Sequence, residues 1–277
     1  MSNSTTMPYV WHNGKITALS SLPFTPDISF IDQSYIIGNV FTSGTEILFA
    51  EESFKNLFKI KHRYDFDSRL LADTTAEFLS NEIKRLLIRN FFYKIGVCIL
   101  LIHENHNGIE QDEIMFIQPA EYLASMDNMI RKIVVAIDYP KPKSDMFMFP
   151  SIMREYKKIL AVQLKCKGAE DCIIVDQQQN ILETYLGNIY LIDGFNVYTP
   201  SLQTGCTDYL IRRTVISSLK QLNFNVHETD NLSAEMLFEV TEVLIAGNEG
   251  IFSLKGIEYK RFFDSVRRPL IEKIFGS

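Results

Sequence analysis

The sequence has few cysteines, and the four that it has form no CxxC pair. Cys98, Cys166, Cys172 and Cys206 lie in or beside apolar runs such as "IGVCILLI". Disulfides and cysteine-based metal sites both depend on paired spacings in the sequence. We therefore expect four buried free thiols, which is typical of a reducing compartment.

Basic blocks and long apolar runs are also missing. Lys and Arg number 28 against 34 Asp and Glu, so the formal net charge is -6, with no cluster that would attract a phosphate backbone. The longest apolar run has about eight residues, whereas a bilayer span needs roughly 20. The N-terminus lacks a charged start followed by an apolar core, so a signal peptide is not expected. We expect a soluble cytoplasmic protein without nucleic-acid or membrane partners.

The motifs of several common sites are absent as well. Neither GxGxxG nor GxxxxGK[ST] occurs, and Gly247 and Gly250 in "LIAGNEGIFS" are typical of an ordinary turn. His103 and His106 stand together in "HENHNG", but they have no cysteine partner and no helical spacing, so we interpret them as solvated turn residues. The remaining histidines are isolated and belong to no nucleophile motif. We expect no metal and no histidine-based triad.

Apolar residues, in contrast, make up 46% of the 277 residues, which is enough to form a large core. In the first part, Asn13-Gly14 in "YVWHNGKIT" predicts a hairpin, and "GTEILFAEE" has a strand-like pattern. Thr74 and Glu77 fit a capping box for a helix that ends near Arg89. The stretch "YKIGVCILLIHENHNGIEQDEIMFIQP" predicts a second, longer hairpin with Asn107-Gly108 in its turn.

The second half alternates helices with closely spaced strands. A helix is predicted over 152–168, ending at Gly168, with an apolar face of Ile152, Tyr156, Ile159, Leu160 and Leu164. Three strands follow in "DCIIVD", "NILETYL" and "NIYLIDG", then a helix in "DYLIRRTVISSLKQL", a strand in "VTEVLIAG" and a helix in "SVRRPLIEKIFG". Strands at hairpin spacing between helices indicate an α+β protein with largely antiparallel pairing. We divide the chain into a domain over 1–120, a connection over 121–133 and a domain over 134–277.

The most informative block runs from Gly168 to Arg213. It contains Glu183, Asn188, Thr199-Pro200 and Gly205 in a strand, turn, strand and helix order. In this order and spacing the sequence resembles the class IV aminotransferases, the fold-type IV pyridoxal-phosphate enzymes that include branched-chain and D-amino-acid aminotransferases and aminodeoxychorismate lyase. The resemblance extends more weakly from about Pro8 to the C-terminus, through "LFAEESFKNLFKIKHRYDF" and "VTEVLIAGNEGIFSLKGIEY".

The resemblance implies a fold, an assembly and a site. The fold would be a small α/β sandwich followed by a larger, barrel-like antiparallel domain, with the cofactor in the crevice between them. The family assembles as homodimers, so a homodimer is the expected partner state. Glu183 stands at the position whose carboxylate pairs with the pyridine nitrogen of the cofactor.

The position of the cofactor's lysine is the main departure from the family. The resemblance places that lysine at Pro150, which has no amine to offer. Lys157 and Lys158 lie seven and eight residues later, inside the predicted helix and about 10 Å away at a rise of 1.5 Å per residue. Lys141 and Lys143 lie at least seven residues too early.

The positions that bind the cofactor's phosphate depart from the family too. The positions at which the family has a histidine and an arginine are Ser53 and Asn56 in this sequence, and Lys55 is adjacent to Asn56. Losing the arginine removes charge-assisted hydrogen bonds of roughly 1.5 to 3 kcal/mol each. Further changed positions are Tyr209-Leu210, Ala246-Gly247, Gln33-Ser34 and Gly38-Asn39. We interpret Asn188 and Thr199-Pro200 as residues that turns of the fold require.

Three hypotheses follow. The favoured one is a class IV aminotransferase-like protein that has lost pyridoxal-phosphate chemistry and acts as a binding or regulatory pseudoenzyme without the cofactor. The alternative is an active aminotransferase or aminodeoxychorismate-lyase-like enzyme that binds pyridoxal phosphate through a relocated lysine, Lys157 or Lys158. The third is a site for another small molecule, such as a small anion, in the same cleft. Its expected walls are Tyr35, Lys55, Arg154, Glu183 and Tyr209.

Overall fold

The structure is a computed structural model that describes residues 7–22, 35–64, 75–104, 111–135, 140–144 and 153–276. Side chains are described for all of these except 35–37, 60–64, 103–104, 111 and 154–155. The chain divides into two compact units, Met1–Glu121 and Tyr122–Ser277. Each unit is described below by itself.

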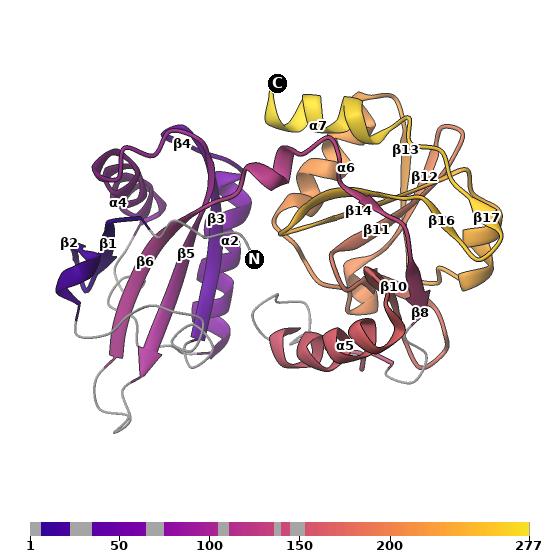
Figure 1. The fold of residues 1–277 in the computed structure, drawn as a ribbon, viewed down its shortest axis with the longest axis horizontal. Coiled ribbons are helices and arrows are strands. Elements are labelled where there is room, and N and C mark those ends of the chain that lie inside the picture. The colour runs from indigo at the N-terminus through magenta and orange to yellow at the C-terminus, as the bar shows by residue number, and fades with distance from the viewer. Residues whose placement is uncertain are drawn as a thin grey trace. The chain divides into compact units, whose positions relative to one another are not determined.

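The first unit is built on a six-stranded antiparallel sheet in the order β2-β1-β6-β5-β3-β4 (Figure 1). Its strands are β1 (Tyr9–His12), β2 (Lys15–Ala18), β3 (Tyr35–Ser43), β4 (Glu46–Ile47), β5 (Ile95–Glu104) and β6 (Gln111–Pro119). The β1-β2 hairpin is confirmed, with Asn13 and Gly14 at φ 46° and 93°, as a two-residue turn requires. The β5-β6 hairpin is also confirmed, whereas its Asn107-Gly108 turn lies outside the described residues.

In the described part of this unit, two long helices pack on the sheet: α2 (Ala50–Tyr64) along β3, and α4 (Ala76–Arg89) beside β1 (Figure 1). The strand expected in "GTEILFAEE" is wrong beyond Ile47, because α2 begins at Ala50. Glu51 and Glu52 in its first turn favour a helix start. The cap of α4 is Thr75, whose hydroxyl accepts from the amide of Phe78 at 3.2 Å, so the predicted cap at Thr74 is wrong by one residue.

In the core of the first unit, α4 packs against the β1-β2 hairpin. The only tryptophan of the chain, Trp11, is 2% exposed, and its indole nitrogen donates to the Glu82 carboxylate at 3.0 Å. On α4, Leu79, Ile83 and Leu86 are fully buried and recur at helical spacing. The predicted helix is therefore an amphipathic helix packed against the sheet.

The second unit contains a three-stranded sheet, β10-β9-β8, a six-stranded sheet, β13-β12-β11-β14-β15-β7, and the small pair β16-β17. The strands are β7 (Met129–Ile130), β8 (Ile133–Val135), β9 (Asp171–Val175), β10 (Ile181–Thr184), β11 (Asn188–Asp193), β12 (Asn196–Pro200), β13 (Asn225–Thr229), β14 (Glu242–Gly247), β15 (Gly250–Leu254), β16 (Gly256–Ile257) and β17 (Lys260–Arg261). Most pairs are antiparallel; β7-β15, β8-β9 and β12-β13 are parallel. The predicted α+β class with largely antiparallel pairing is confirmed.

One core is shared by the two larger sheets of this unit. Ile173 and Ile181 of the three-stranded sheet belong to the same buried cluster as Leu191 and Ile245 of the six-stranded sheet. The side chains between the sheets therefore form a single apolar interior, as expected of the predicted barrel-like domain.

Among the residues described in this unit, three α-helices pack around these sheets: α5 (Met153–Lys167), α6 (Ile211–Gln221) and α7 (Arg267–Phe275). Leu160 and Leu164 of α5 pack on Cys172 and Ile174 of β9. The predicted apolar face is wrong at Ile159, which is 50% exposed. The helix ends at Gly168 as predicted, with φ +56°, a left-handed conformation that favours glycine. Short 3-10 turns occur at Leu19–Ser21, Glu121–Ala124, Leu202–Thr204 and Ala234–Phe238.

All four cysteines are free. Three are buried, and burial raises the pKa of the Cys98 and Cys172 thiols to about 12. Cys166 is exposed, so the expectation of four buried thiols is wrong for this residue. Among the described residues, no helix has the length and apolar character of a membrane span, and no group of three or more His, Cys, Asp or Glu side chains is arranged to hold a metal ion.

Candidate functional site

Glu183 lies on β10, at a point where the strand departs from regular pairing. Ile181 pairs with Val175 and Glu183 pairs with Ile174, so one extra residue is inserted between them. Such a β-bulge redirects the side chains that follow it. The Glu183 side chain is completely buried. All four residues of β10 are buried, so the carboxylate lies in the interior of the unit, next to the irregular point of the strand.

The Glu183 carboxylate is paired with Lys141. The Lys141 amine lies 2.5 Å from Oε1 of Glu183, and both side chains have zero exposed surface. The Lys141 backbone amide also donates to the Val175 carbonyl at 2.9 Å, which anchors the segment to β9. A buried charge is tolerated only when it is paired and hydrogen-bonded. This ion pair thus supplies Glu183 with a counter-charge from the chain itself.

Thr207 connects the ion pair to the loop before α6. Its amide donates to Oε2 of Glu183 at 3.0 Å, and its hydroxyl lies 3.3 Å from the Lys141 amine. The Asn188 side-chain amide donates to the Thr207 carbonyl at 2.8 Å. Both carboxylate oxygens of Glu183 therefore accept a hydrogen bond from the same unit.

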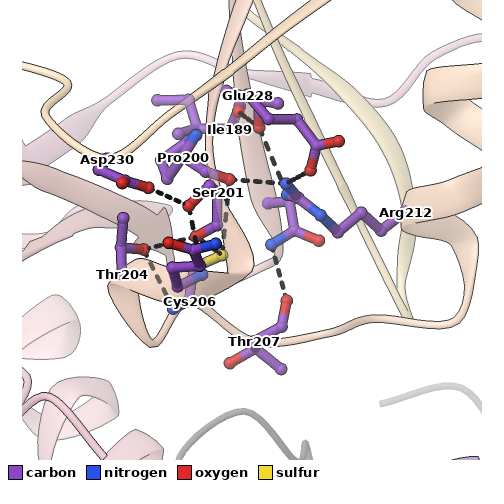
Figure 2. A network of polar contacts seen from close by, with 12 residues as sticks. Ile189, Pro200, Ser201, Thr204, Cys206, Thr207, Arg212, Glu228 and Asp230 are labelled. Atoms are coloured by element: carbon purple, nitrogen blue, oxygen red, sulfur yellow. Dashed lines mark hydrogen bonds and ion pairs between the residues drawn. The ribbon is translucent and has the colours of Figure 1, made fainter.

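Arg212, in the first turn of α6, bonds to the end of β12, where this loop begins, and to β13 (Figure 2). The Arg212 guanidinium, 1% exposed, donates to the Pro200 carbonyl at 2.6 Å and to the Glu228 carboxylate at 2.8 Å. The Thr199 hydroxyl donates across to the Ile189 carbonyl at 2.8 Å. Asn188 is the first residue of β11, and Thr199 and Pro200 are the last two residues of β12. Our interpretation of them as turn residues is therefore wrong. They are tied to the loop that carries Thr207.

Lys157, on α5, lies beside two tyrosines of the same unit. Its amine is 5.2 Å from the ring centre of Tyr185 and 5.1 Å from that of Tyr209. Burial lowers the pKa of Lys157, and the charge of Glu183 opposes this shift. Tyr209 is 2% exposed, and burial raises its pKa. Burial thus favours the neutral form of the Lys157 amine, whereas the two tyrosine rings and the charge of Glu183 favour its charged form.

Asp171, at the start of β9, is a second buried carboxylate in this region. Its Oδ1 accepts from the amides of Cys172 at 2.8 Å and Leu186 at 3.2 Å, while Oδ2 has no partner among the described residues. Burial raises its pKa from 3.8 to about 7, although the hydrogen bonds and the charge of Lys157 act in the opposite direction. Asp171 is thus a titratable group at neutral pH that the sequence patterns had not indicated.

Ala246-Gly247 form the end of β14, and the backbone there is tightly packed. A Cβ atom at Gly187 would lie 2.2 Å from the Ala246 carbonyl oxygen, and one at Gly247 would lie 2.0 Å from the Leu186 carbonyl oxygen. Both distances are below any real contact, so neither glycine can carry a side chain without moving the backbone. Ala246 is fully buried and pairs with Asn188.

The remaining predicted site residues are distributed as follows. Pro150, Gln33 and Ser34 lie outside the described residues, as do the side chains of Tyr35 and Arg154. In the first unit, Lys55 is exposed on α2, Asn56 is half-buried, Ser53 is buried, and Gly38-Asn39 lie on β3. In the second unit, Lys143 and Lys158 are exposed, and Leu210 is buried directly before α6. Glu183, Lys157 and Tyr209 are the predicted residues that the second unit brings together.

Comparison with known proteins places the chain in a family. The family model for amino-transferase class IV matches residues 67–255, which is more than half of the chain. The chain belongs to the class IV aminotransferase family. No curated protein sequence shows significant similarity to it.

Solved structures of similar fold cover nearly the whole chain. A branched-chain aminotransferase from Thermoproteus uzoniensis, solved with norvaline, has a TM-score of 0.79 at 17% identity over 96% of this chain and 93% of that one. A mutant branched-chain aminotransferase from Thermobaculum terrenum has a TM-score of 0.82 at 12% identity over 98% and 94%. A putative 4-amino-4-deoxychorismate lyase from Legionella pneumophila has a TM-score of 0.71 at 16% identity over 93% and 96%. The predicted fold-type IV architecture is confirmed.

Proposed function

We propose that this chain is a class IV aminotransferase-like protein that has lost pyridoxal-phosphate chemistry and acts as a binding or regulatory pseudoenzyme. The observation that carries the proposal is the Lys141-Glu183 ion pair. In the family the carboxylate at this position receives the cofactor's ring nitrogen. Here it is enclosed, neutralised by the 2.5 Å contact with Lys141, and bonded to the Thr207 amide.

The poor fit between pyridoxal phosphate and these residues supports the same proposal. The ring nitrogen would have to displace Lys141 and leave a second buried charge without its partner, which costs several kcal/mol. At the phosphate end, where the family has a glycine, this chain buries the ring of Tyr209. The residues of the second unit therefore do not fit pyridoxal phosphate.

Lys141 is also no replacement for the missing lysine. A lysine that holds pyridoxal phosphate bonds to the aldehyde carbon, on the side of the ring opposite to the nitrogen. The Lys141 amine instead contacts the carboxylate that the nitrogen would use.

The experiment adds excess pyridoxal phosphate to the purified full-length chain, records the visible absorbance, and repeats the scan after desalting. We expect no band to remain after desalting. Borohydride reduction followed by peptide mass spectrometry should find no modified lysine. A saturable band that survives desalting, together with one modified lysine, would overturn the proposal.

The alternative, an active aminotransferase or aminodeoxychorismate-lyase-like enzyme, depends on Lys157. Burial lowers the pKa of Lys157, which favours a nucleophilic amine. Lys158, its exposed neighbour on α5, is a matched control. If the enzyme hypothesis holds, the retained band should disappear in Lys157→Met and persist in Lys158→Met.

We further propose that the protein acts in the cytoplasm as a homodimer. The support for the homodimer is the assembly implied by the family resemblance, and the support for the compartment is the set of four free cysteines. Light scattering coupled to size-exclusion chromatography tests the dimer directly. A mass equal to one chain at all concentrations would contradict it.

A further inference from the structure

A cavity of about 410 Å³ opens in the second unit, lined by residues from three short segments. Arg131 and Lys132 come from the connection between β7 and β8, Lys255 precedes β16, and Arg261 ends β17. Ile133 and Ile257 are buried and form an apolar part of the lining. None of these residues belongs to the cluster around Glu183. The volume falls in the range of small-molecule sites.

Backbone carbonyls position two of the four basic side chains at this cavity, Lys132 and Arg261, without neutralising their charge. The Lys132 amine donates to the Lys167 carbonyl at 2.5 Å, at the end of α5. The Arg261 guanidinium donates to the carbonyls of Glu258 at 2.9 Å and Lys260 at 3.1 Å. A carbonyl fixes a cation in place but leaves its full charge. Within the described residues, none of the four forms a salt bridge.

The backbone at β16 provides the space for Arg261. A Cβ atom at Gly256 would lie 3.0 Å from a guanidinium nitrogen of Arg261 and 3.1 Å from its Cδ. The pairing of Gly256 with Arg261 brings the two positions together. The arginine therefore lies against bare backbone, so that its two backbone hydrogen bonds orient it beside the cavity.

Two acidic residues lie close enough to this cavity to offset part of the positive charge. Glu258 lines the cavity. The Glu170 carboxylate accepts hydrogen bonds from the backbone amides of Arg131 and Lys132. Four positive groups against these two negative ones leave an excess of positive charge. The chain as a whole carries -6, so this local excess is opposite in sign to the rest of the molecule.

We propose that this cavity binds a small molecule that carries phosphate groups. A phosphate brings nearly two negative charges and three acceptor oxygens, whereas a monocarboxylate brings one charge and two oxygens. Arginine binds such oxygens in pairs, and lysine binds them as a point charge. The cavity's four cations and its mostly polar lining match a phosphate better than an apolar or monoanionic ligand.

The test is calorimetric titration of the full-length protein with pyrophosphate at low ionic strength. The variants are Lys255→Gln and Arg261→Gln, with Lys220→Gln as the control, because Lys220 is an exposed lysine at the end of α6 that does not line the cavity. We expect saturable binding that weakens with salt. The two cavity variants should each bind about tenfold more weakly, the control should bind as the wild type does, and acetate should not saturate.

Two results for the wild type and the cavity variants would overturn the proposal. One is the absence of saturable pyrophosphate binding to the wild type. The other is equal binding by wild type, Lys255→Gln and Arg261→Gln, which would place the anion elsewhere. Lys157→Met separates this site from the cluster around Glu183: we expect it to bind pyrophosphate normally, and a loss of binding there would assign the anion to that cluster instead.

Discussion

At the scale of single residues, Lys141 and Glu183 determine what the buried site can accept. Their contact excludes water from both charges, so the loss of either partner leaves a charge that has no compensation. Neither local sequence nor periodicity indicated the pair, because the partners are 42 residues apart and Lys141 stands between prolines in "YPKPK". Glu183 itself was predicted only through the family resemblance.

The first prediction concerns this pair. Lys141→Met should lower the free energy of unfolding by about 3 to 5 kcal/mol, because Glu183 stays buried without its cation. Urea unfolding measures the loss. The double variant Lys141→Met/Glu183→Gln should lose less, since a neutral glutamine still accepts from the Thr207 amide. Equal losses in both proteins would show that the ion pair has no such role.

The second prediction concerns Asp171. Its raised pKa means that the folded state binds a proton that the unfolded state has already released between pH 3.8 and about 7. The free energy of unfolding therefore falls as pH rises through this window, by up to about 4 kcal/mol.

Asp171→Asn removes that dependence, and we expect the variant to be more stable than wild type at neutral pH. Urea unfolding across the pH range measures the effect, with the exposed Asp193→Asn as control. Parallel pH curves for wild type and Asp171→Asn would contradict the assignment.

At the scale of elements, the sequence predicts segments that have a clear helical period or a recognisable turn between two strands. It does not predict segments in which a strand leads directly into a helix. The β5-β6 hairpin and helices α4, α5 and α6 were all predicted, with errors of one to a few residues at their ends. Helix α2 was missed because the apolar run of "GTEILFAEE" leads directly into its acidic first turn, which hides the change from strand to helix. The exposure of Ile159 was also not predictable, since it depends on which face of α5 meets β9.

The third prediction tests the start of α4. Thr75→Ala should lower the free energy of unfolding by about 1 kcal/mol, because the hydroxyl that accepts from the Phe78 amide is lost. Chemical unfolding followed by circular dichroism measures the change. Thr74→Ala is the control and should have little effect. A larger loss of stability in Thr74→Ala than in Thr75→Ala would show that Thr74 is the N-cap instead.

The fourth prediction tests the loop that carries Thr207. Arg212→Leu should lower the free energy of unfolding by about 2 to 4 kcal/mol, since the Pro200 carbonyl loses a charged donor in a buried position (Figure 2). Arg213→Leu, the half-buried neighbour, should change it by no more than about 0.5 kcal/mol. Thermal unfolding of the three proteins compares them, and similar losses in both variants would contradict a specific role for Arg212.

At the scale of the whole molecule, no sheet among the described residues is shared between the two units, and each unit has its own buried cluster. The α+β class and the family were accessible from the sequence because they depend on the order of elements and on a few spaced residues. The contacts of the Glu183 cluster were not accessible, since α5, β9, β10 and the loop before α6 meet only in the folded unit.

The single tryptophan gives the two units separate spectroscopic signals. Trp11 is buried in the first unit against Glu82, and the second unit has no tryptophan. Intrinsic tryptophan fluorescence therefore follows the unfolding of the first unit alone, while far-ultraviolet circular dichroism follows both. Any stabilisation by pyrophosphate in the second unit would shift the dichroism transition and leave the fluorescence transition in place, provided that the units unfold independently. One denaturation series with two detectors thus reports on each half of the chain without labels.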